Sequence, residues 1–281
     1  MEIKEIEKSI IKKFRKSIWS RFIDAINDFE MINEGDRIAV CISGGKDSFL
    51  LAKCMQEIKR HGKVDFDLKF IVMDPGYSKE VRNLIEENSR NLDLDINVFD
   101  TSIFDTVNTI NEDKPCYLCA RMRRGYLYDY AKKLECNKIA LGHHFDDVIE
   151  TILLNVIYAG EMKTMMPKLK STNFKGMELI RPLYYVRESD IIAWSNYCDL
   201  RFINCACKFT KKYGSDSKRI EMKNLIANFR KISPYIETNI MKSAFNVNID
   251  SVIGYKKDGI KHNFIEEYDD ELSSKDDRNI K

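Results

Sequence analysis

The sequence predicts an α/β protein built on a doubly wound, mostly parallel sheet. From Arg37 onward, short apolar runs typical of buried strands alternate with segments of helical periodicity, an alternation typical of parallel sheets covered by helices on both faces. A glycine turn, SGGKDS at residues 43–48, separates the first strand from the first helix of this series. The 281 residues suffice for one main domain with appended segments.

Four regions follow one another along the chain. Residues 1–32 form an amphipathic helix, because apolar side chains recur at helical spacing among Lys and Arg, and it could pack on its own domain or on a partner subunit. Residues 33–200 form the main domain. Residues 201–264 form a basic helical region, and residues 265–281, with seven acids and three bases, form a solvated and poorly ordered tail.

The elements of these regions are predicted in order. The strands are 37–42, 66–73, 96–99, 138–142 and 178–182, and the helices are 3–29, 49–60, 79–91, a helix after residue 115, 146–159, 191–197, 217–231 and 235–246.

The composition indicates a soluble, cytoplasmic protein. No apolar run reaches the roughly 20 residues of a membrane span, and the N-terminus has no apolar signal-peptide core. Eight cysteines without such a signal favour thiols or metal ligands over a disulfide framework. Four of them lie in apolar surroundings and are expected to be buried: Cys41, Cys54, Cys136 and Cys198.

The glycine turn predicts a phosphate site. Gly44 and Gly45 let the backbone approach an anion, and the N–H groups of the turn and of the following helix start would point at it. Ser43, Lys46 and Ser48 add side-chain donors. The spacing is not that of a GxxxxGK[ST] loop.

A second group of polar residues, GHHFDD at residues 142–147, follows the fourth strand of the main domain. Ligands of open α/β sheets bind outside the carboxyl ends of the strands, so this group should face the glycine turn. Asp146 and Asp147 suit a helix N-terminus in any protein, but at this position they could join Asp47 in a Mg²⁺ site.

The cysteines form a third group. Cys116 and Cys119 make a CxxC pair that opens a basic, aromatic helix, and Cys205 and Cys207 follow about 90 residues later. A redox pair needs no third thiol, so the second pair favours a metal, and the ligand count leaves zinc and iron–sulfur open. Both stretches are rich in Arg, Lys and aromatic residues, which suits nucleic acid as well as an ordinary solvated helix face.

Taken together, SGGKDS, CYLCARMRRGYLY, ALGHHFDDVIETILLN and FINCACKF resemble the tRNA 2-thiocytidine synthetases of the ATP-pyrophosphatase superfamily, over residues 37–241. The resemblance implies an adenine nucleotide α-hydrolase-like fold. It also implies that ATP adenylates the 2-carbonyl oxygen of cytidine 32 in the tRNA anticodon loop, and that sulfur delivered through a 4Fe-4S cluster then displaces AMP.

The resemblance also assigns residues. Catalysis falls to Asp47, Asp146, Asp147 and Arg123; nucleotide binding to Ser43, Gly44, Gly45, Lys46, Asp47, Ser48, Met73, Gly142 and His143; Mg²⁺ to Asp47 and Asp147; and the cluster to Cys116, Cys119 and Cys205. The family shows PCNLC at the third cluster ligand where this chain has NCAC, so Cys207 stays an alternative to Cys205.

Expected partners are tRNA, a sulfur donor in the form of a cysteine desulfurase or free sulfide, and a second copy of the chain. Three other functions remain open. They are a tRNA 2-thiouridine synthetase, an ATP-dependent amide or amine ligase with structural zinc, and a nucleotide-sensing or RNA-binding protein that keeps the fold without turnover.

Overall fold

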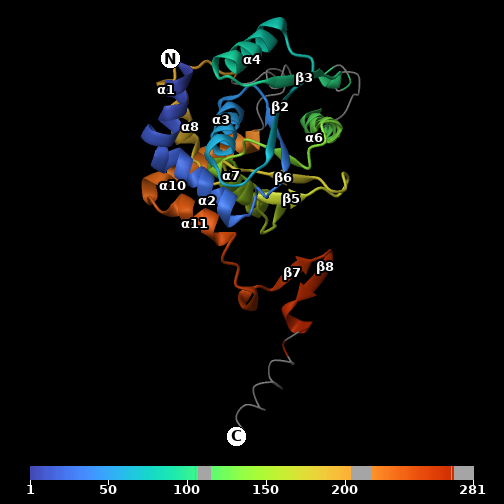
Figure 1. Ribbon diagram of the computed structural model, residues 1–281. Coiled ribbons are helices and arrows are strands. Elements are labelled where there is room, and N and C mark those ends of the chain that lie inside the picture. Colours follow the sequence, from blue (N-terminus) through green and yellow to red (C-terminus); the bar gives the residue numbers. More distant parts are fainter. Residues whose placement is uncertain (105, 107–114, 204–216, 267, 269–281) are drawn as a thin grey trace.

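The structure, a computed structural model, describes residues 1–104, 106, 115–203, 217–266 and 268, with the backbone alone described at 115–117 and 217. Its centre is a six-stranded sheet in the order β3-β2-β1-β4-β6-β5 (Figure 1). The strands are β1 (Arg37–Ile42), β2 (Asp67–Asp74), β3 (Ile96–Asp100), β4 (Lys138–Ala140), β5 (Lys168–Lys170) and β6 (Glu178–Ile180). All neighbours pair in parallel except β5, which is antiparallel to β6 at the edge. The predicted doubly wound, mostly parallel sheet is confirmed.

Helices cover both faces of this sheet. Side chains of β1 alternate between the faces: Ile38, Val40 and Ile42 join the larger apolar cluster, whereas Ala39 and Cys41 join the cluster under α6. The helices are α3 (Lys46–His61), α4 (Lys79–Asn91), α6 (Pro115–Lys133), α7 (Phe145–Leu154) with η3 (Asn155–Ala159), α8 (Glu188–Tyr197), α10 (Ser217–Ile232) and α11 (Ile236–Ser243). Among the described helices, none is long and apolar enough to cross a membrane.

The N-terminal segment packs on its own domain rather than standing free. Five buried side chains recur along it at every fourth position: Ile6, Ile10, Phe14, Ile18 and Phe22. In a regular α-helix this spacing would rotate the buried stripe by about 40° per step. Two wider π turns compensate for this rotation and keep the stripe on one side. They are closed by the hydrogen bonds from Phe14 N to Ser9 O at 2.8 Å and from Trp19 N to Phe14 O at 3.3 Å. The pieces are α1 (Ile3–Lys8), η1 (Ser9–Lys13), η2 (Arg15–Trp19) and α2 (Ser20–Asp28).

The C-terminal region contains a hairpin that the sequence analysis did not predict. After α11 and the short helix η4 (Ile249–Ser251), strands β7 (Gly254–Lys257) and β8 (Ile260–Asn263) pair antiparallel and project away from the main body (Figure 1). The predicted acidic tail lies almost wholly outside the described residues. The four cysteines expected to be buried are buried, with exposed fractions of 7% or less.

The strand order places a crevice beside β1. The chain runs outward from β1 through β2 to β3 and then returns to β4 on the other side of β1. At such a switch point the loops after β1 and β4 diverge, and a ligand can enter between them. The glycine turn and the GHHFDD segment are those two loops.

Candidate active site

The glycine turn between β1 and α3 is held by Ser48. Its hydroxyl donates to Gly45 O at 2.8 Å and accepts from Ser43 N at 3.1 Å, so the loop is closed before any ligand binds. Gly44 has a φ of +88°, which L side chains rarely adopt. The turn leads into the N-terminus of a 16-residue helix, an arrangement suited to an anion.

Gly142 brings the loop after β4 against this turn. A Cβ at Gly142 would lie 3.1 Å from the backbone of both Asp47 and Ser48. A larger residue would therefore push the two loops apart. The predicted nucleotide-binding glycine thus sits at the closest approach of the two loops.

Lys46 lies between two carboxylates. Its ammonium nitrogen is 3.1 Å from Asp47 Oδ1 and 3.2 Å from Glu188 Oε1 at the start of α8. Burial by itself lowers the pKa of Lys46, but these carboxylates outweigh it, so the pKa lies above its ordinary value. Lys46 therefore carries a positive charge, and the phosphates of a bound nucleotide could replace Asp47 and Glu188 as its partners.

Asp47 and Asp147 approach a common point beside His144. His144 Nε2 is 3.9 Å from Asp47 Oδ1 and 3.5 Å from Asp147 Oδ2. Within the described part of the chain, Asp47 Oδ1 is buried and accepts no well-aligned hydrogen bond. Burial by itself raises the pKa of Asp147, but the nearby His144 and Arg219 lower it by more. The net pKa therefore lies below its ordinary value, and the group stays ionised. Two carboxylates at one point suit a hard cation.

Asp146 is engaged elsewhere. Its Oδ2 accepts from Glu188 N at 2.7 Å, which ties it to the N-terminus of α8, and its Oδ1 is 3.1 Å from Arg230 Nη2 of α10. Only 7% of Asp146 is exposed. The two neighbouring aspartates therefore face different partners, and Asp147 is the one at the cavity.

His143 is a neutral hydrogen-bonding group. Burial, followed by the charge of Arg181, lowers its pKa to about 4. Arg181 Nε donates to His143 Nδ1 at 3.3 Å. A neutral imidazole that accepts at Nδ1 carries its proton on Nε2, which makes Nε2 a donor.

Arg123 and Leu127 of α6 line the same crevice. Positions 116, 119, 123 and 127 follow helical spacing, so they share a face. Cys119 is 7% exposed and packs in a cluster with Met73, Ile103 and Phe104. Arg123 comes one turn later, and its buried Nε has no hydrogen-bond partner among the described residues.

Two cavities meet at the glycine turn. The β4 cavity, about 260 Å³, includes Met73, Gly142, His143 and Asp147 in its lining. The α8 cavity, about 650 Å³, is lined by Lys46, Glu188 and the α8 residues Ile192, Ser195 and Asn196, among others. Both cavities share Ser43, Asp47, Tyr77 and Arg123.

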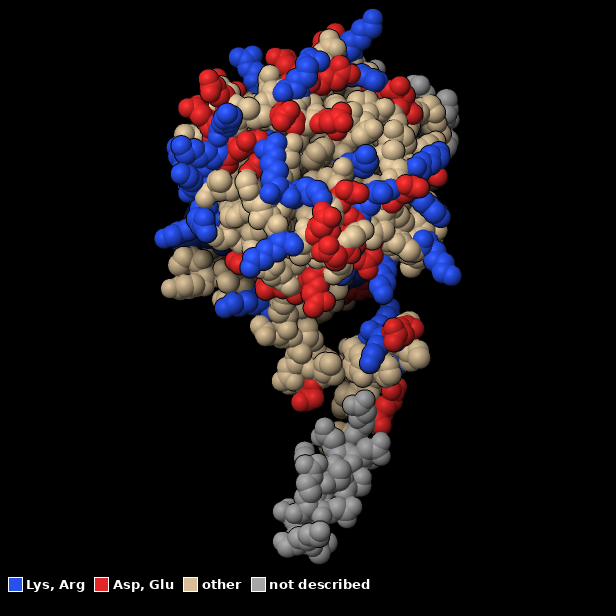
Figure 2. Space-filling view, viewed as in Figure 1, with Lys and Arg blue, Asp and Glu red and all other residues tan. Residues whose placement is uncertain are grey.

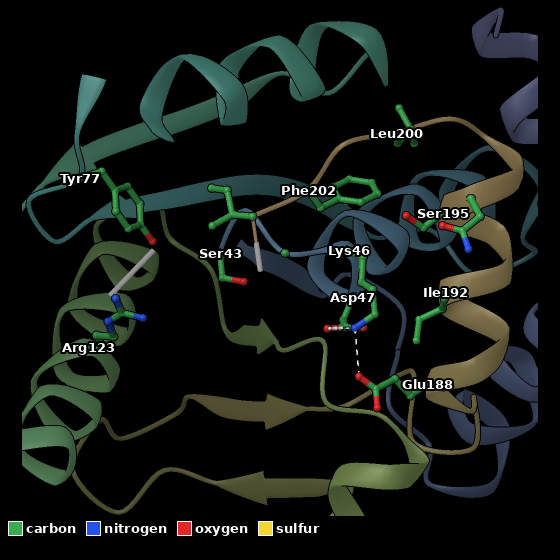
Figure 3. Close-up of a pocket in the computed structure, with 13 residues that line it drawn as sticks. Ser43, Lys46, Asp47, Tyr77, Arg123, Glu188, Ile192, Ser195, Leu200 and Phe202 are labelled. Carbon is green, nitrogen blue, oxygen red and sulfur yellow. Dashed lines mark hydrogen bonds and ion pairs between the residues drawn. The ribbon is translucent and has the colours of Figure 1, made fainter. Parts of the chain in front are cut away.

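Figure 3 shows this arrangement for the α8 cavity. Tyr77 and Arg123 stand at one end and the α8 residues at the other, with Ser43, Lys46 and Asp47 between them. The cavities are therefore two compartments of one site.

The segment that leads to the second cysteine pair is fixed to the glycine turn. Ile203 N donates to Gly44 O at 3.1 Å, and a Cβ at Gly44 would lie 2.5 Å from Ile203 Cδ1. Cys205 and Cys207 themselves lie outside the described residues, as does the side chain of Cys116. No group of three metal-ligating side chains occurs within the described ranges.

Several residues of the site were not predicted. Glu188, Arg181 and Arg219 reach it from α8, the loop after β6 and α10, and nothing in their local sequence marks them. Tyr77 follows β2, so the rule that ligands bind beyond the carboxyl ends of strands would have found it.

The chain is similar to known proteins over most of its length. Residues 14–222 match the model of the PP-loop domain family. The tRNA-cytidine(32) 2-sulfurtransferase of Pelobacter propionicus is 36% identical over 228 residues, covering 80% of this chain and 83% of that protein. The enzyme of the same name from Coxiella burnetii is 36% identical over 256 residues, covering 88% and 93%.

A solved structure shares the fold. The U34-tRNA thiolase from Methanococcus maripaludis, determined with its 4Fe-4S cluster, superposes with a TM-score of 0.65 at 20% identity, covering 83% of this chain and 80% of that one.

Proposed function

The chain belongs to the PP-loop domain family and, within it, to the tRNA-cytidine(32) 2-sulfurtransferases, and from this premise we propose that it is an ATP-dependent enzyme that thiolates tRNA. The observation that carries the proposal is the meeting of a phosphate turn, residues 43–48, with Arg123 of α6 across shared cavities, one helical turn after the buried Cys119. We propose further that the target is the C2 carbonyl of a cytidine at position 32.

The β4 cavity would receive the adenine nucleotide. Met73 and the backbone after β1 border the space for the base, and His143 Nε2 offers a donor there. The phosphates would lie along the turn, where Lys46 exchanges its carboxylate partners for phosphate oxygens. Asp47 and Asp147 would hold Mg²⁺, since carboxylate oxygens are hard ligands and Asp47 Oδ1 has no donated hydrogen bond among the described residues.

The proposed reaction has two substitutions. The cytidine O2 attacks the α-phosphorus of ATP and pyrophosphate leaves, so the base oxygen carries the adenylate. Hydrosulfide then attacks C2 and AMP departs with the former carbonyl oxygen, leaving C2=S. Arg123, which lines both cavities, would stabilise the charge that develops on the phosphates.

Cys116, Cys119 and Cys205 would hold a 4Fe-4S cluster, with Cys207 as the alternative third ligand. Three features support this donor set. Cys119 is buried among apolar side chains, Cys116 lies one helical turn before it, and Ile203, two residues before Cys205, is hydrogen bonded to the phosphate turn. Three thiolates would leave one iron of such a cluster without a protein ligand, and the bound group could supply sulfide there. The sulfur would come from a cysteine desulfurase or from free sulfide, and we expect the enzyme to act as a homodimer.

Nucleoside mass spectrometry tests the proposal. Transfer RNA from cells lacking this gene should lose 2-thiocytidine, and a plasmid copy should restore it. Loss of a 2-thiouridine instead would support tRNA thiolation but show that the target base is a uridine. An unchanged nucleoside profile would refute the proposal.

Metal analysis tests the cluster separately. Anaerobically purified protein should contain iron and acid-labile sulfide, and Cys119→Ser should lower both while nucleotide binding persists. Zinc without iron would favour the ligase with a structural metal. Adding sulfide alone, or a desulfurase with cysteine, to the in vitro reaction would identify the donor.

A further inference from the structure

The N-terminal helices carry an unusual concentration of positive charge on their outer side. Between positions 8 and 23 the chain has six Lys or Arg residues and no Asp or Glu. Five of the six are exposed and define what we call the N-terminal basic face: Lys8, Lys12, Lys13, Arg15 and Lys16. Figure 2 shows Lys and Arg side chains gathered on the left, over the position of these helices in Figure 1.

This charge is not neutralised within the described parts of the protein. The ion pairs of the N-terminal helices involve Glu7 and Arg21 instead, and no described carboxylate lies within 4.0 Å of the five. Some lysines elsewhere on the surface find partners, as Lys59 does with Asp65 and Lys133 with Asp129. The basic face is therefore available to an external anion.

The opposite side of the same helices is fully occupied. Ile6, Ile10, Ile18 and Phe22 are at most 1% exposed and belong to the main apolar cluster. A basic amphipathic helix binds a lipid surface by inserting its apolar side. Here that apolar side is buried in the domain, so the exposed side favours a polyanion that binds through its charge without inserting apolar groups.

The basic face adjoins the α8 cavity. The Lys13 ammonium lies 3.5 Å from the ring centroid of Tyr197, which is 40% exposed, and Phe14 meets the same ring edge-on at 5.8 Å. Tyr197 directly follows Asn196, which lines the cavity together with Ser195. One helix end thus links the exposed lysines to the compartment that holds Lys46 and Asp47.

We propose that the N-terminal basic face and Tyr197 bind the sugar–phosphate backbone of the tRNA whose base enters the α8 cavity. The inference rests on the proposed function and adds to it the surface that holds the substrate. Lys and Arg release counterions when they meet phosphates, which makes binding salt-dependent, and the tyrosine hydroxyl is a further hydrogen-bond donor for a phosphate oxygen.

The test compares two triple variants of the full-length holoenzyme. The face variant is Lys12→Gln, Lys13→Gln and Lys16→Gln. The control is Lys63→Gln, Lys132→Gln and Lys175→Gln. These three exposed lysines precede β2, β4 and β6, so they lie toward the amino-terminal ends of the strands, whereas the cavities lie at the carboxyl ends. Both lose three charges, so only location differs.

The measurements are the affinity for an unmodified tRNA transcript from about 0.05 to 0.2 M KCl, and kcat and KM for thiolation. The face variant should bind roughly tenfold more weakly or worse at about 0.1 M salt, with a salt slope shallower by about 2. Its KM for tRNA should rise more than its kcat falls, whereas the control should resemble the wild type.

Equal behaviour of the two variants, with wild-type thiolation intact, would overturn the inference and leave the proposed function standing. A wild-type enzyme that neither binds nor thiolates tRNA would refute both. A face variant that keeps its tRNA affinity but no longer binds vesicles of anionic phospholipid would assign the face to a membrane instead.

Discussion

Replacing Gly44 with alanine should damage the phosphate turn in two separable ways. A φ of +88° costs an L residue about 1–2 kcal/mol. The new Cβ would also lie 2.5 Å from Ile203 Cδ1 and 3.0 Å from Ile85 Cγ1, and such overpacking typically costs about 1–3 kcal/mol. We expect the free energy of unfolding to fall by about 2–5 kcal/mol.

Gly176→Ala is the matched control. Gly176 has a φ of +82°, and nothing lies within 4 Å of the Cβ that alanine would add. This variant should therefore show only the backbone cost, about 1–2 kcal/mol. Urea unfolding of the two variants then yields the steric part of the Gly44 effect as their difference.

The double variant Gly44→Ala with Ile203→Ala removes the closest clash, the one with Ile203 Cδ1, and leaves only the looser contact with Ile85, whose Cγ1 lies at 3.0 Å. Relative to Ile203→Ala alone, the added alanine at position 44 should cost little more than in the control. ATP-dependent pyrophosphate release should fall on the order of a hundredfold in Gly44→Ala, because the turn is displaced, and stay normal in Gly176→Ala. Equal destabilisation of Gly44→Ala and Gly176→Ala would refute the reasoning, since Ile203 would then not be held against the turn.

Three further predictions concern the loop after β4. Asp147→Asn should lower pyrophosphate release on the order of a hundredfold with little change in the thermal midpoint, because the cation loses a charged ligand. Asp146→Asn should instead reduce the free energy of unfolding by about 1–3 kcal/mol, because the charged hydrogen bond between the buried Asp146 and Arg230 is lost, although Arg230 keeps Glu237 as a partner; equal activity losses with unchanged stability would contradict this division. Because the pKa of His143 is lowered from 6.5 to about 4, its contribution to stability is complete above pH 6.5 and disappears as the pH falls toward 4. In His143→Gln, the slope of unfolding free energy against pH in that window should flatten by up to about 1.4 kcal/mol per pH unit; an unchanged slope would show that His143 is not buried in its neutral form.

The fold and the phosphate turn could be predicted because their signals are local. An apolar run, a glycine pair and a helical period each depend on neighbouring residues, and the switch point of the sheet then orders the loops. The hairpin at residues 254–263 was missed although Asp258 and Gly259, with φ of +52° and +82°, form a readable turn. Its strands contain few apolar residues, so the usual strand pattern is absent.

The sequence by itself determined which residue types stand at the ends of the strands, and therefore the kind of chemistry the crevice can support. Only the tertiary structure separated Asp146 from Asp147, since adjacent positions at a helix start point in different directions and one meets Arg230 while the other meets the cavity. It likewise paired Lys46 with Glu188, across 142 positions of chain. Such pairings depend on how the helices pack on the sheet, a property of the whole apolar core that no local pattern encodes.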